Sequence, residues 1–268
     1  MRFTRYGSLK GRTVIITGGA SAIGASFVRA FVENGAKVAF LDLQRETGTA
    51  LSDSLVECAA RPLFVPCDLT DTAALRAALG EIRAALGSAA VLVNNAANDQ
   101  RYEFDQITPE QFDRTIAVNF RHVFFAAQAI VPQMRDLGYG SIVNMSSVSW
   151  MRGIPLLEAY ASAKAAIVGF TNTLARALGP HRIRVNAIAP RHRAHRAPAP
   201  AVVSDGSAGR GGTRGAMPAR LDRAGRHRES RAVPRLRRQP ADHQADDLGQ
   251  RRRALTNPFA RKIDQIKV

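Results

Sequence analysis

Residues 14–34 have the sequence VIITGGASAIGASFVRAFVEN, and this stretch decides the fold. It begins with a short β-branched run, turns through small residues between Thr17 and Gly24, and continues with apolar residues three and four apart. The first pattern predicts a buried strand and the second a helix with one apolar face. Small residues at such a turn let the backbone approach a ligand phosphate, whose charge is favoured by the N–H groups that begin the helix. Any tight turn between a strand and a helix can also use glycine. The rest of the sequence therefore has to decide between a phosphate-binding turn and an ordinary tight turn.

The same alternation of strand and helix continues as far as Pro190. Strands are predicted at Val14–Thr17, Lys37–Leu41, Leu63–Cys67, Val91–Asn94, Ser141–Met145 and Arg184–Ile188. Helices are predicted at Gly24–Asn34, Gln44–Ala60, Thr72–Leu86, Gln111–Met134 and Ala159–Leu178. The strands are mostly apolar, as expected for strands covered on both faces. We therefore predict an α/β fold of the Rossmann-like type, a doubly wound parallel sheet in three layers.

Length and composition narrow the function classes. A chain of 268 residues is most simply one such α/β domain. No apolar stretch is long enough for a membrane span, and the first residues lack the pattern of a signal peptide, so a cytoplasmic protein is expected. The two cysteines, Cys58 and Cys67, have no histidine near them at metal-ligand spacing. They are expected to be buried small apolar residues, and no metal site is predicted.

Positive charge divides the chain into two parts. Residues 191–268 hold 19 Lys and Arg against 7 Asp and Glu, whereas residues 1–190 hold 19 against 15. The order of strands and helices stops at the same place, and Phe259 is the only aromatic residue beyond it. Such a composition cannot form a core. We expect a catalytic domain at 1–190 and a basic, low-complexity, disordered tail at 191–268.

A basic tail can bind nucleic acid through phosphate neutralisation. Here 17 of the 19 cationic residues are arginine, and no base-stacking aromatic residues are interleaved with them. Nucleic-acid binding is therefore the weaker interpretation of the tail.

Asp42 ends the second predicted strand, about twenty residues after the glycine-rich turn. A carboxylate there can accept hydrogen bonds from both hydroxyls of an adenosine ribose and would repel a 2′-phosphate. This favours NAD over NADP as the cofactor. Arg45 is close enough in sequence to leave NADP possible.

Tyr160 and Lys164 are four residues apart in a predicted helix, so both project from one face. An ammonium near a phenol favours the phenolate, which would make Tyr160 a usable general base. Ser147 follows the strand 141–145, at the sheet edge where open α/β sheets bind ligands. Each signal alone is common, but the three residues together form a specific constellation.

With these residues the first 190 positions resemble the short-chain dehydrogenase/reductase family. Its active-site tetrad corresponds to Asn119, Ser147, Tyr160 and Lys164. The resemblance implies that Tyr160 takes the hydroxyl proton, Lys164 lowers its pKa and holds the nicotinamide ribose, Ser147 orients the substrate oxygen, and Asn119 anchors a water. The cofactor residues it implies are Gly18, Ser21, Ala22, Ile23, Gly24, Asp42, Asp68, Leu69, Asn95, Ala96, Tyr160, Lys164 and Pro190.

Three departures from the family pattern stand out. Ala22 and Ala97 replace glycines, and each is expected to add only a methyl group. The family's Pro-Gly is here Pro190-Arg191, and the sequence beyond it is unfamiliar. The family's last helix and strand are therefore predicted to be missing.

The resemblance extends to the bacterial aldose 1-dehydrogenases, which oxidise sugars to lactones. It rests on residues 98–102, 119–122 and 147–150. It implies a substrate site that includes Asn98, Arg101, Ser149 and Trp150, and a homodimer or homotetramer for the in-frame enzyme. A 3-oxoacyl thioester or another carbonyl remains an alternative substrate, because the family's substrate loop lies beyond Pro190.

The tail also fits a gene translated out of frame. A shift of one nucleotide after the Pro190 codon permits the family's Pro-Gly, a last helix and strand, and a stop codon at Leu255. A single inserted C would suffice. The chain as given could then be an inactive product, which remains a third alternative.

Overall fold

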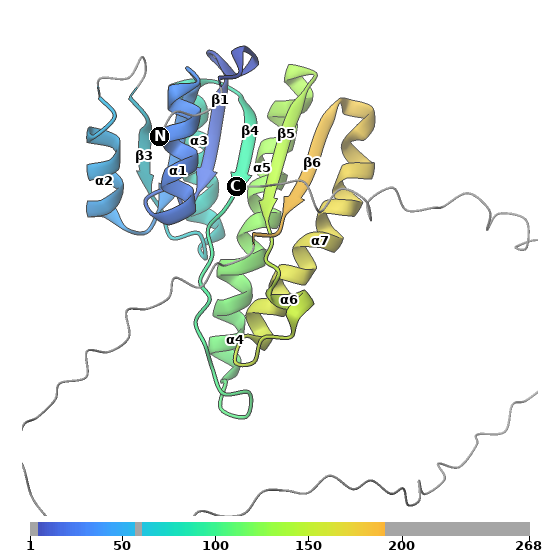
Figure 1. The fold of residues 1–268 in the computed structure, drawn as a ribbon. Coiled ribbons are helices and arrows are strands. Elements are labelled where there is room, and N and C mark those ends of the chain that lie inside the picture. The colour runs from blue at the N-terminus through green and yellow to red at the C-terminus, as the bar shows by residue number, and fades with distance from the viewer. Residues whose placement is uncertain (1–4, 57–60, 191–268) are drawn as a thin grey trace, which may run out of the picture. The chain divides into compact units, whose positions relative to one another are not determined.

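The computed structural model describes residues 5–56 and 61–190. Within them, six parallel strands form one sheet in the order β3-β2-β1-β4-β5-β6 (Figure 1). The strands are β1 Thr13–Thr17, β2 Lys37–Asp42, β3 Leu63–Pro66, β4 Ala89–Asn94, β5 Gly140–Met145 and β6 Ile183–Ile188. The sheet confirms the predicted fold class, and each strand ends within two residues of its predicted bounds.

Helices cover both faces of the sheet. They are α1 Ala22–Glu33, α2 Arg45–Asp53, α3 Thr72–Leu86, α4 Pro109–Ile116, α5 His122–Leu137, α6 Ser149–Arg152 and α7 Glu158–Leu178. Helices α1 and α2 bury their apolar side chains against one face, and α3, α5 and α7 against the other. Each face has its own apolar core, because the alternate side chains of each strand point to opposite faces. These are the predicted three layers.

One predicted helix is interrupted. The periodicity predicts a single helix over Gln111–Met134, but α4 and α5 are separated by a π-helical segment, η2, at Ala117–Arg121. The backbone N–H of His122 bonds to the carbonyl of Ala117, five residues back. Such bulges often occur at functional sites, and this one carries Asn119.

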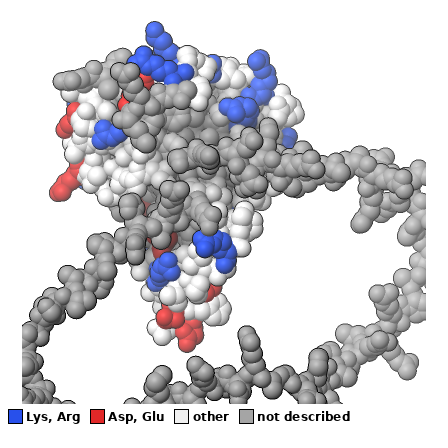
Figure 2. Space-filling view, in the orientation of Figure 1, with Lys and Arg blue, Asp and Glu red and all other residues white. Residues whose placement is uncertain are grey.

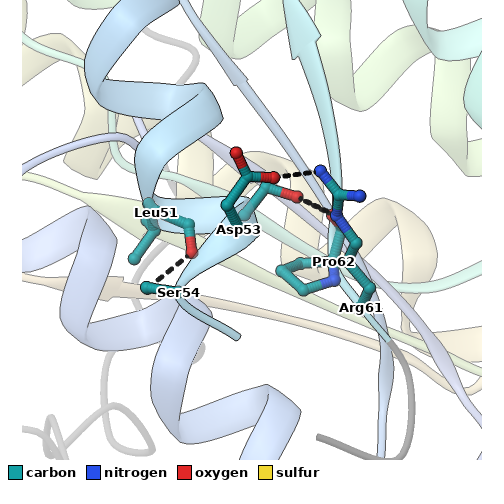
Figure 3. A network of polar contacts seen from close by, with 6 residues as sticks. Leu51, Asp53, Ser54, Arg61 and Pro62 are labelled. Carbon is teal, nitrogen blue, oxygen red and sulfur yellow. Dashed lines mark hydrogen bonds and ion pairs between the residues drawn. The ribbon is translucent and has the colours of Figure 1, made fainter. Parts of the chain in front are cut away.

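A second predicted helix, Gln44–Ala60, is shorter than expected. Helix α2 ends at Asp53, where the hydroxyl of Ser54 donates to the carbonyl of Leu51 (Figure 3). Arg61 then forms an ion pair with Asp53. Serine hydroxyls compete with the helical backbone hydrogen bonds, which explains the early end. Cys58 lies outside the described residues, whereas Cys67 is buried as predicted.

Strand β6 forms one edge of the sheet in the described part of the chain. Ile183 and Val185 are buried against α7, whereas Arg184 and Asn186 are exposed on the opposite face. Among the described residues, no helix covers that face of β6. The predicted loss of the last helix and strand concerns 191–268, which lie outside the described residues.

Surface charge bears on nucleic-acid binding, and the length and apolar character of the helices bear on membrane insertion. Lys and Arg lie in small groups among Asp and Glu on the face seen in Figure 2, rather than in one continuous basic surface. Within the described residues, no helix has both the length and the apolar character to cross a membrane.

Candidate functional site

The carboxyl ends of β1 and β4 are neighbours at the point where the strand order reverses. In open α/β sheets this is the crevice that binds ligands. Asn95 joins the two strand ends. Its side-chain amide donates to the carbonyl of Gly18 at 2.8 Å, and its backbone N–H donates to the hydroxyl of Thr17 at 3.0 Å. The same hydroxyl accepts from Ala96 at 3.2 Å, so the predicted cofactor residues Gly18, Asn95 and Ala96 lie together.

Two glycines of the turn are required by close packing. A Cβ on Gly18 would lie 2.6 Å from the Cα of Ala96, and Gly18 has φ +66°. A Cβ on Gly24 would lie 1.9 Å from the Gly18 carbonyl oxygen. Larger side chains at either position would push the turn away from β4.

Ala22 is not the small departure that we expected. Its φ is +47°, in the left-handed region that favours glycine. An alanine there costs roughly 1 kcal/mol in backbone strain. Ala97 is not among the residues with positive φ, so the expectation of a small change stands there.

The start of α1 supplies the donors that a pyrophosphate needs. Ser21 is the N-cap, and its side chain makes no capping hydrogen bond. Ser21, Ala22 and Ile23 are all exposed. An exposed helix N-terminus without a side-chain cap presents N–H groups and the positive end of the helix dipole.

Asp42 lies beside this turn and is buried at 8 % exposure. One carboxylate oxygen accepts from the N–H of Ala20 at 2.9 Å, and the other from the N–H of Gln44 at 3.1 Å. Each oxygen keeps a second lone pair that can accept from a ribose hydroxyl. Arg45 is exposed at the first turn of α2.

The predicted cofactor residues Asp68 and Leu69 lie in a turn after β3. Asp68 accepts from both the N–H and the hydroxyl of Thr70, and these hydrogen bonds hold the pKa of Asp68 below its usual value. Leu69 is buried. Arg121, at the end of η2, donates to the Thr70 carbonyl at 2.8 Å, which ties this turn to the π-helical segment.

Ser147, Tyr160 and Lys164 lie together after β5 and along α7. The Lys164 ammonium is 5.6 Å from the centre of the Tyr160 ring and donates to the Met145 carbonyl at 2.9 Å. The backbone N–H of Ser149 donates to the Ser147 hydroxyl at 3.1 Å, which fixes that hydroxyl at the start of α6. Lys164 is 2 % exposed, and burial lowers its pKa to about 8.

Burial, Ser147 and Asp99 shift the pKa of Tyr160. Burial raises it above its usual value, the hydrogen bond with Ser147 lowers it, and the carboxylate of Asp99 raises it further. Lys164 is not among the groups that shift this pKa. The Lys164 ammonium donates to the Met145 carbonyl and lies 5.6 Å from the centre of the Tyr160 ring, and its expected lowering of the Tyr160 pKa stays a prediction.

Asn119 is completely buried on η2 and acts on the loop after β4. Its amide donates to the carbonyls of Asn98 at 2.9 Å and Thr115 at 3.0 Å, and its oxygen accepts from the Asn98 N–H at 3.0 Å. Both amide donors are therefore used on the backbone. The residue positions Asn98 directly, a role that the sequence did not indicate.

Of the four predicted substrate residues, Asn98 and Arg101 lie in the loop after β4, and Ser149 and Trp150 begin α6. Asn98 lines a pocket of about 470 Å³ with Arg114 and Thr115. Arg101 is exposed and does not line this pocket. Ser149 is buried, and its hydroxyl and the indole N–H of Trp150 have no hydrogen-bond partner among the described residues.

A second pocket, of about 510 Å³, reaches Tyr160 from the side of α4. Leu156 stands out among its lining residues because its φ is +66°. Its carbonyl accepts from Tyr102 at 3.2 Å, which joins the two loops that flank the pocket. Sequence patterns gave no signal for this pocket, because its residues come from separate loops. They are Gln100, Tyr102, Phe104, Ile107, Phe112, Leu156, Leu157, Glu158, Ala159, Tyr160 and Ser162.

Pro190 lies against the strand end that carries Ser147. Its carbonyl accepts from the N–H of Val148 at 3.5 Å, and the Ile188 carbonyl accepts from Ser146 at 2.7 Å. The last described residues therefore border the site. Among the described residues, no group of three or more His, Cys, Asp or Glu side chains could hold a metal ion.

Known proteins share both the sequence and the fold. The sequence model of the family described as "short chain dehydrogenase" matches residues 12–193. A Rhizobium meliloti (strain 1021) protein named "Probable galactose dehydrogenase GalD" is 46% identical over 188 residues, 70% of this chain and 73% of its own length. D-xylose 1-dehydrogenase of Caulobacter vibrioides (strain NA1000 / CB15N) is 43% identical over 185 residues, 69% of this chain and 73% of its own length.

A solved structure agrees with these matches. The 3-ketoacyl-(acyl-carrier-protein) reductase from Brucella melitensis, complexed with NADH, superposes with a TM-score of 0.64 and 28% identity, covering 68% of this chain and 76% of that one. Sheet order, the turn after β1 and the long family match lead to one conclusion. The chain belongs to the short-chain dehydrogenase family and is an NAD(P)-dependent oxidoreductase.

Proposed function

We propose that the enzyme oxidises an aldose at its anomeric carbon to the lactone, with NAD as the cofactor. The similarity to two sugar dehydrogenases at 43% and 46% identity carries this proposal. The polar pocket lined by Asn98, Gln100, Tyr102, Arg114 and Thr115 supports it, because sugar hydroxyls need several polar partners. Gln100 and Tyr102 also line the pocket that reaches Tyr160.

The described residues fit a dinucleotide. The uncapped start of α1 would hold the pyrophosphate, and Asp42 would accept from the adenosine ribose hydroxyls. Lys164 keeps two N–H donors beyond its bond to Met145 and would hold the second ribose with them. When bound, the nicotinamide supplies the hydride acceptor.

The side chains after β5 and on α7 would perform the proton transfer. The Tyr160 phenolate takes the proton of the anomeric hydroxyl, and the Ser147 hydroxyl orients the substrate oxygen. Burial raises the pKa of Tyr160 and so favours the neutral phenol over the phenolate. The positive charges of a bound oxidised nicotinamide and of Lys164 would favour the Tyr160 phenolate.

The test is a substrate panel with purified protein from a gene in which the reading frame is restored after the Pro190 codon. We expect D-galactose or D-xylose to produce NADH, followed by slow acidification as the lactone hydrolyses. A 3-oxoacyl thioester serves as the comparison substrate. Turnover of the thioester with no oxidation of any aldose would reject the sugar proposal and leave the family assignment intact.

Cofactor preference has its own test. Trp150 is the only tryptophan of the chain and follows Ser147 closely in sequence, so its fluorescence reports binding at the site. We expect tighter binding of NADH than of NADPH, and Asp42→Ala should reduce the difference. Arg45→Ala is the matched control and should leave the preference for NADH in place. Tighter binding of NADPH to the unaltered chain would contradict the proposal.

We also propose that residues 191–268 arise from translation out of frame. The family match stops at residue 193, close to where the composition shifts to Arg, Pro, Ala and Gly. The exposed face of β6, with Arg184 and Asn186, is where a further helix would pack. A homodimer or homotetramer is then expected for the in-frame enzyme.

A further inference from the structure

Ser146 is a buried hydroxyl residue that the proposed chemistry does not use. It directly follows Met145, the last residue of β5, and is 4 % exposed. Its backbone N–H donates to the Ile188 carbonyl at 2.7 Å, so β6 fixes its main chain. Its hydroxyl donates to the main-chain carbonyl of Lys164 at 2.7 Å. An alanine would fill the position with no polar group to satisfy, so the hydroxyl adds a contact that the packing of the core does not need.

Lys164 is held to this strand end through both its main chain and its side chain. Its carbonyl accepts from the Ser146 hydroxyl, and its ammonium donates to the Met145 carbonyl at 2.9 Å. In an α-helix each carbonyl already accepts the N–H four residues on, so Ser146 uses the second lone pair. Because Met145 and Ser146 are consecutive, the two hydrogen bonds close one ring through Lys164. A slide or rotation of this turn of α7 would therefore lengthen or misalign them.

A second buried hydrogen bond joins β5 to the same helix. The Asn144 amide donates to the Thr171 hydroxyl at 3.0 Å, and both side chains are buried. Asn144 and Ser146 are two residues apart, so their side chains lie on one face of the strand. Lys164 and Thr171 are seven residues apart, close to two turns of α7, which packs beside β5 (Figure 1). This second bond docks α7 on β5 without involving Lys164.

We propose that Ser146 is a positioning residue for Lys164. It sets the turn of α7 that carries Lys164 against the strand end that leads into Ser147. The ammonium is thereby held where it lies, 5.6 Å from the centre of the Tyr160 ring. The part of this proposal that concerns binding and turnover rests on the role proposed for Lys164, which is to hold the nicotinamide ribose.

Two substitutions separate placement of Lys164 from docking of α7. Ser146→Ala removes the hydroxyl and keeps the backbone N–H that bonds to Ile188, so the strand end should stay in place. Thr171→Val is the matched control, because it removes the acceptor of Asn144 and keeps the shape of the side chain. It deprives a buried amide of this acceptor, whereas Ser146→Ala leaves the Lys164 carbonyl its helical hydrogen bond. The control should therefore lower the denaturant midpoint at least as much as Ser146→Ala does.

The first measurement is the rate at which acetic anhydride acetylates Lys164 in the frame-restored protein, without cofactor or substrate. Peptide mass spectrometry follows the product, with the exposed Lys37 as the internal standard. We expect Ser146→Ala to raise the rate about fivefold, as for the loss of one typical hydrogen bond, and Thr171→Val to leave it within about twofold. Ser146→Thr keeps a hydroxyl and should restore the slow rate. Equal rates in Ser146→Ala and Thr171→Val would overturn the proposal, because the hydroxyl would then do no more than dock the helix.

The second measurement is the affinity for NADH and the kcat value of the same proteins. We expect Ser146→Ala to weaken NADH binding about fivefold and to lower kcat, and Thr171→Val to change neither beyond about twofold although its midpoint falls as far. Losses in Thr171→Val as large as those in Ser146→Ala would show that function follows stability, and would overturn the proposal. Acetylation needs neither cofactor nor substrate, so its rates decide the placement of Lys164 even if no aldose is oxidised.

Discussion

Single residues set the geometry of the cofactor turn. Gly18 and Gly24 are fixed by close approach, whereas Ala22 occupies a left-handed conformation that a glycine would adopt without strain. The motif in the sequence named both positions, and the close approaches explain why each is a glycine. The motif could not predict the strain at Ala22, because a backbone dihedral angle is visible only once the turn is built.

Ala22→Gly should stabilise the protein by up to about 1 kcal/mol, because it relieves the positive φ at a modest entropic cost in the unfolded chain. The free energy of unfolding from denaturant titration measures this change. Ala25→Gly, three residues further in α1, is the control and should destabilise by about 1 kcal/mol. A destabilised Ala22→Gly variant would contradict the strain at this position.

Secondary-structure elements bring the site together. The strands could be predicted to within two residues, because buried parallel strands have continuous apolar runs. The π-helical segment η2, the single turn α6 and the loop pairing at Leu156 could not, because they depend on contacts between distant segments. The predicted substrate residues lie in the loop after β4 and at the start of α6, which follow no periodicity, and their role stays a prediction.

Helix α7 buries Lys164 in the sheet-facing part of the site, and this has a consequence for stability. Its pKa is about 8 in the folded state against an ordinary value of 10.5, so between these pH values the unfolded chain binds more protons. Stability should therefore rise with pH from about 8 to 10.5, by roughly 3 kcal/mol if Lys164 acts alone.

Denaturant titrations at several pH values measure this dependence. Other lysines and tyrosines titrate in the same range, so Lys164→Met provides the comparison. The variant should lack the rise that the unaltered chain shows. Parallel pH profiles of the two proteins would mean that Lys164 is not desolvated in the folded state.

At the scale of the whole molecule, the described part is a six-stranded catalytic domain with an uncovered face at β6. The change of composition after Pro190 predicts that this domain ends there, and that boundary stays a prediction. The out-of-frame proposal for 191–268 is tested on the gene. Resequencing across the Pro190 codon should reveal one extra nucleotide.

The frame-restored chain should then show a higher denaturant midpoint than the chain as given, because a last helix and strand would bury apolar surface at β6. The matched control carries the restored frame with a stop codon directly after Pro190. A gene without the extra nucleotide, whose product is as stable as the restored chain, would contradict the out-of-frame proposal.

The central claim is that Tyr160 is the base in the oxidation of an aldose by NAD. The most direct measurement is the rate of NADH formation from D-galactose or D-xylose by the frame-restored protein and by its Tyr160→Phe variant, with NADH affinity measured on both. We predict that kcat falls by roughly a thousandfold or more while the affinity for NADH stays within about twofold, since the substitution removes the proton acceptor and little packing. A Tyr160→Phe variant that keeps substantial turnover would contradict the assigned base.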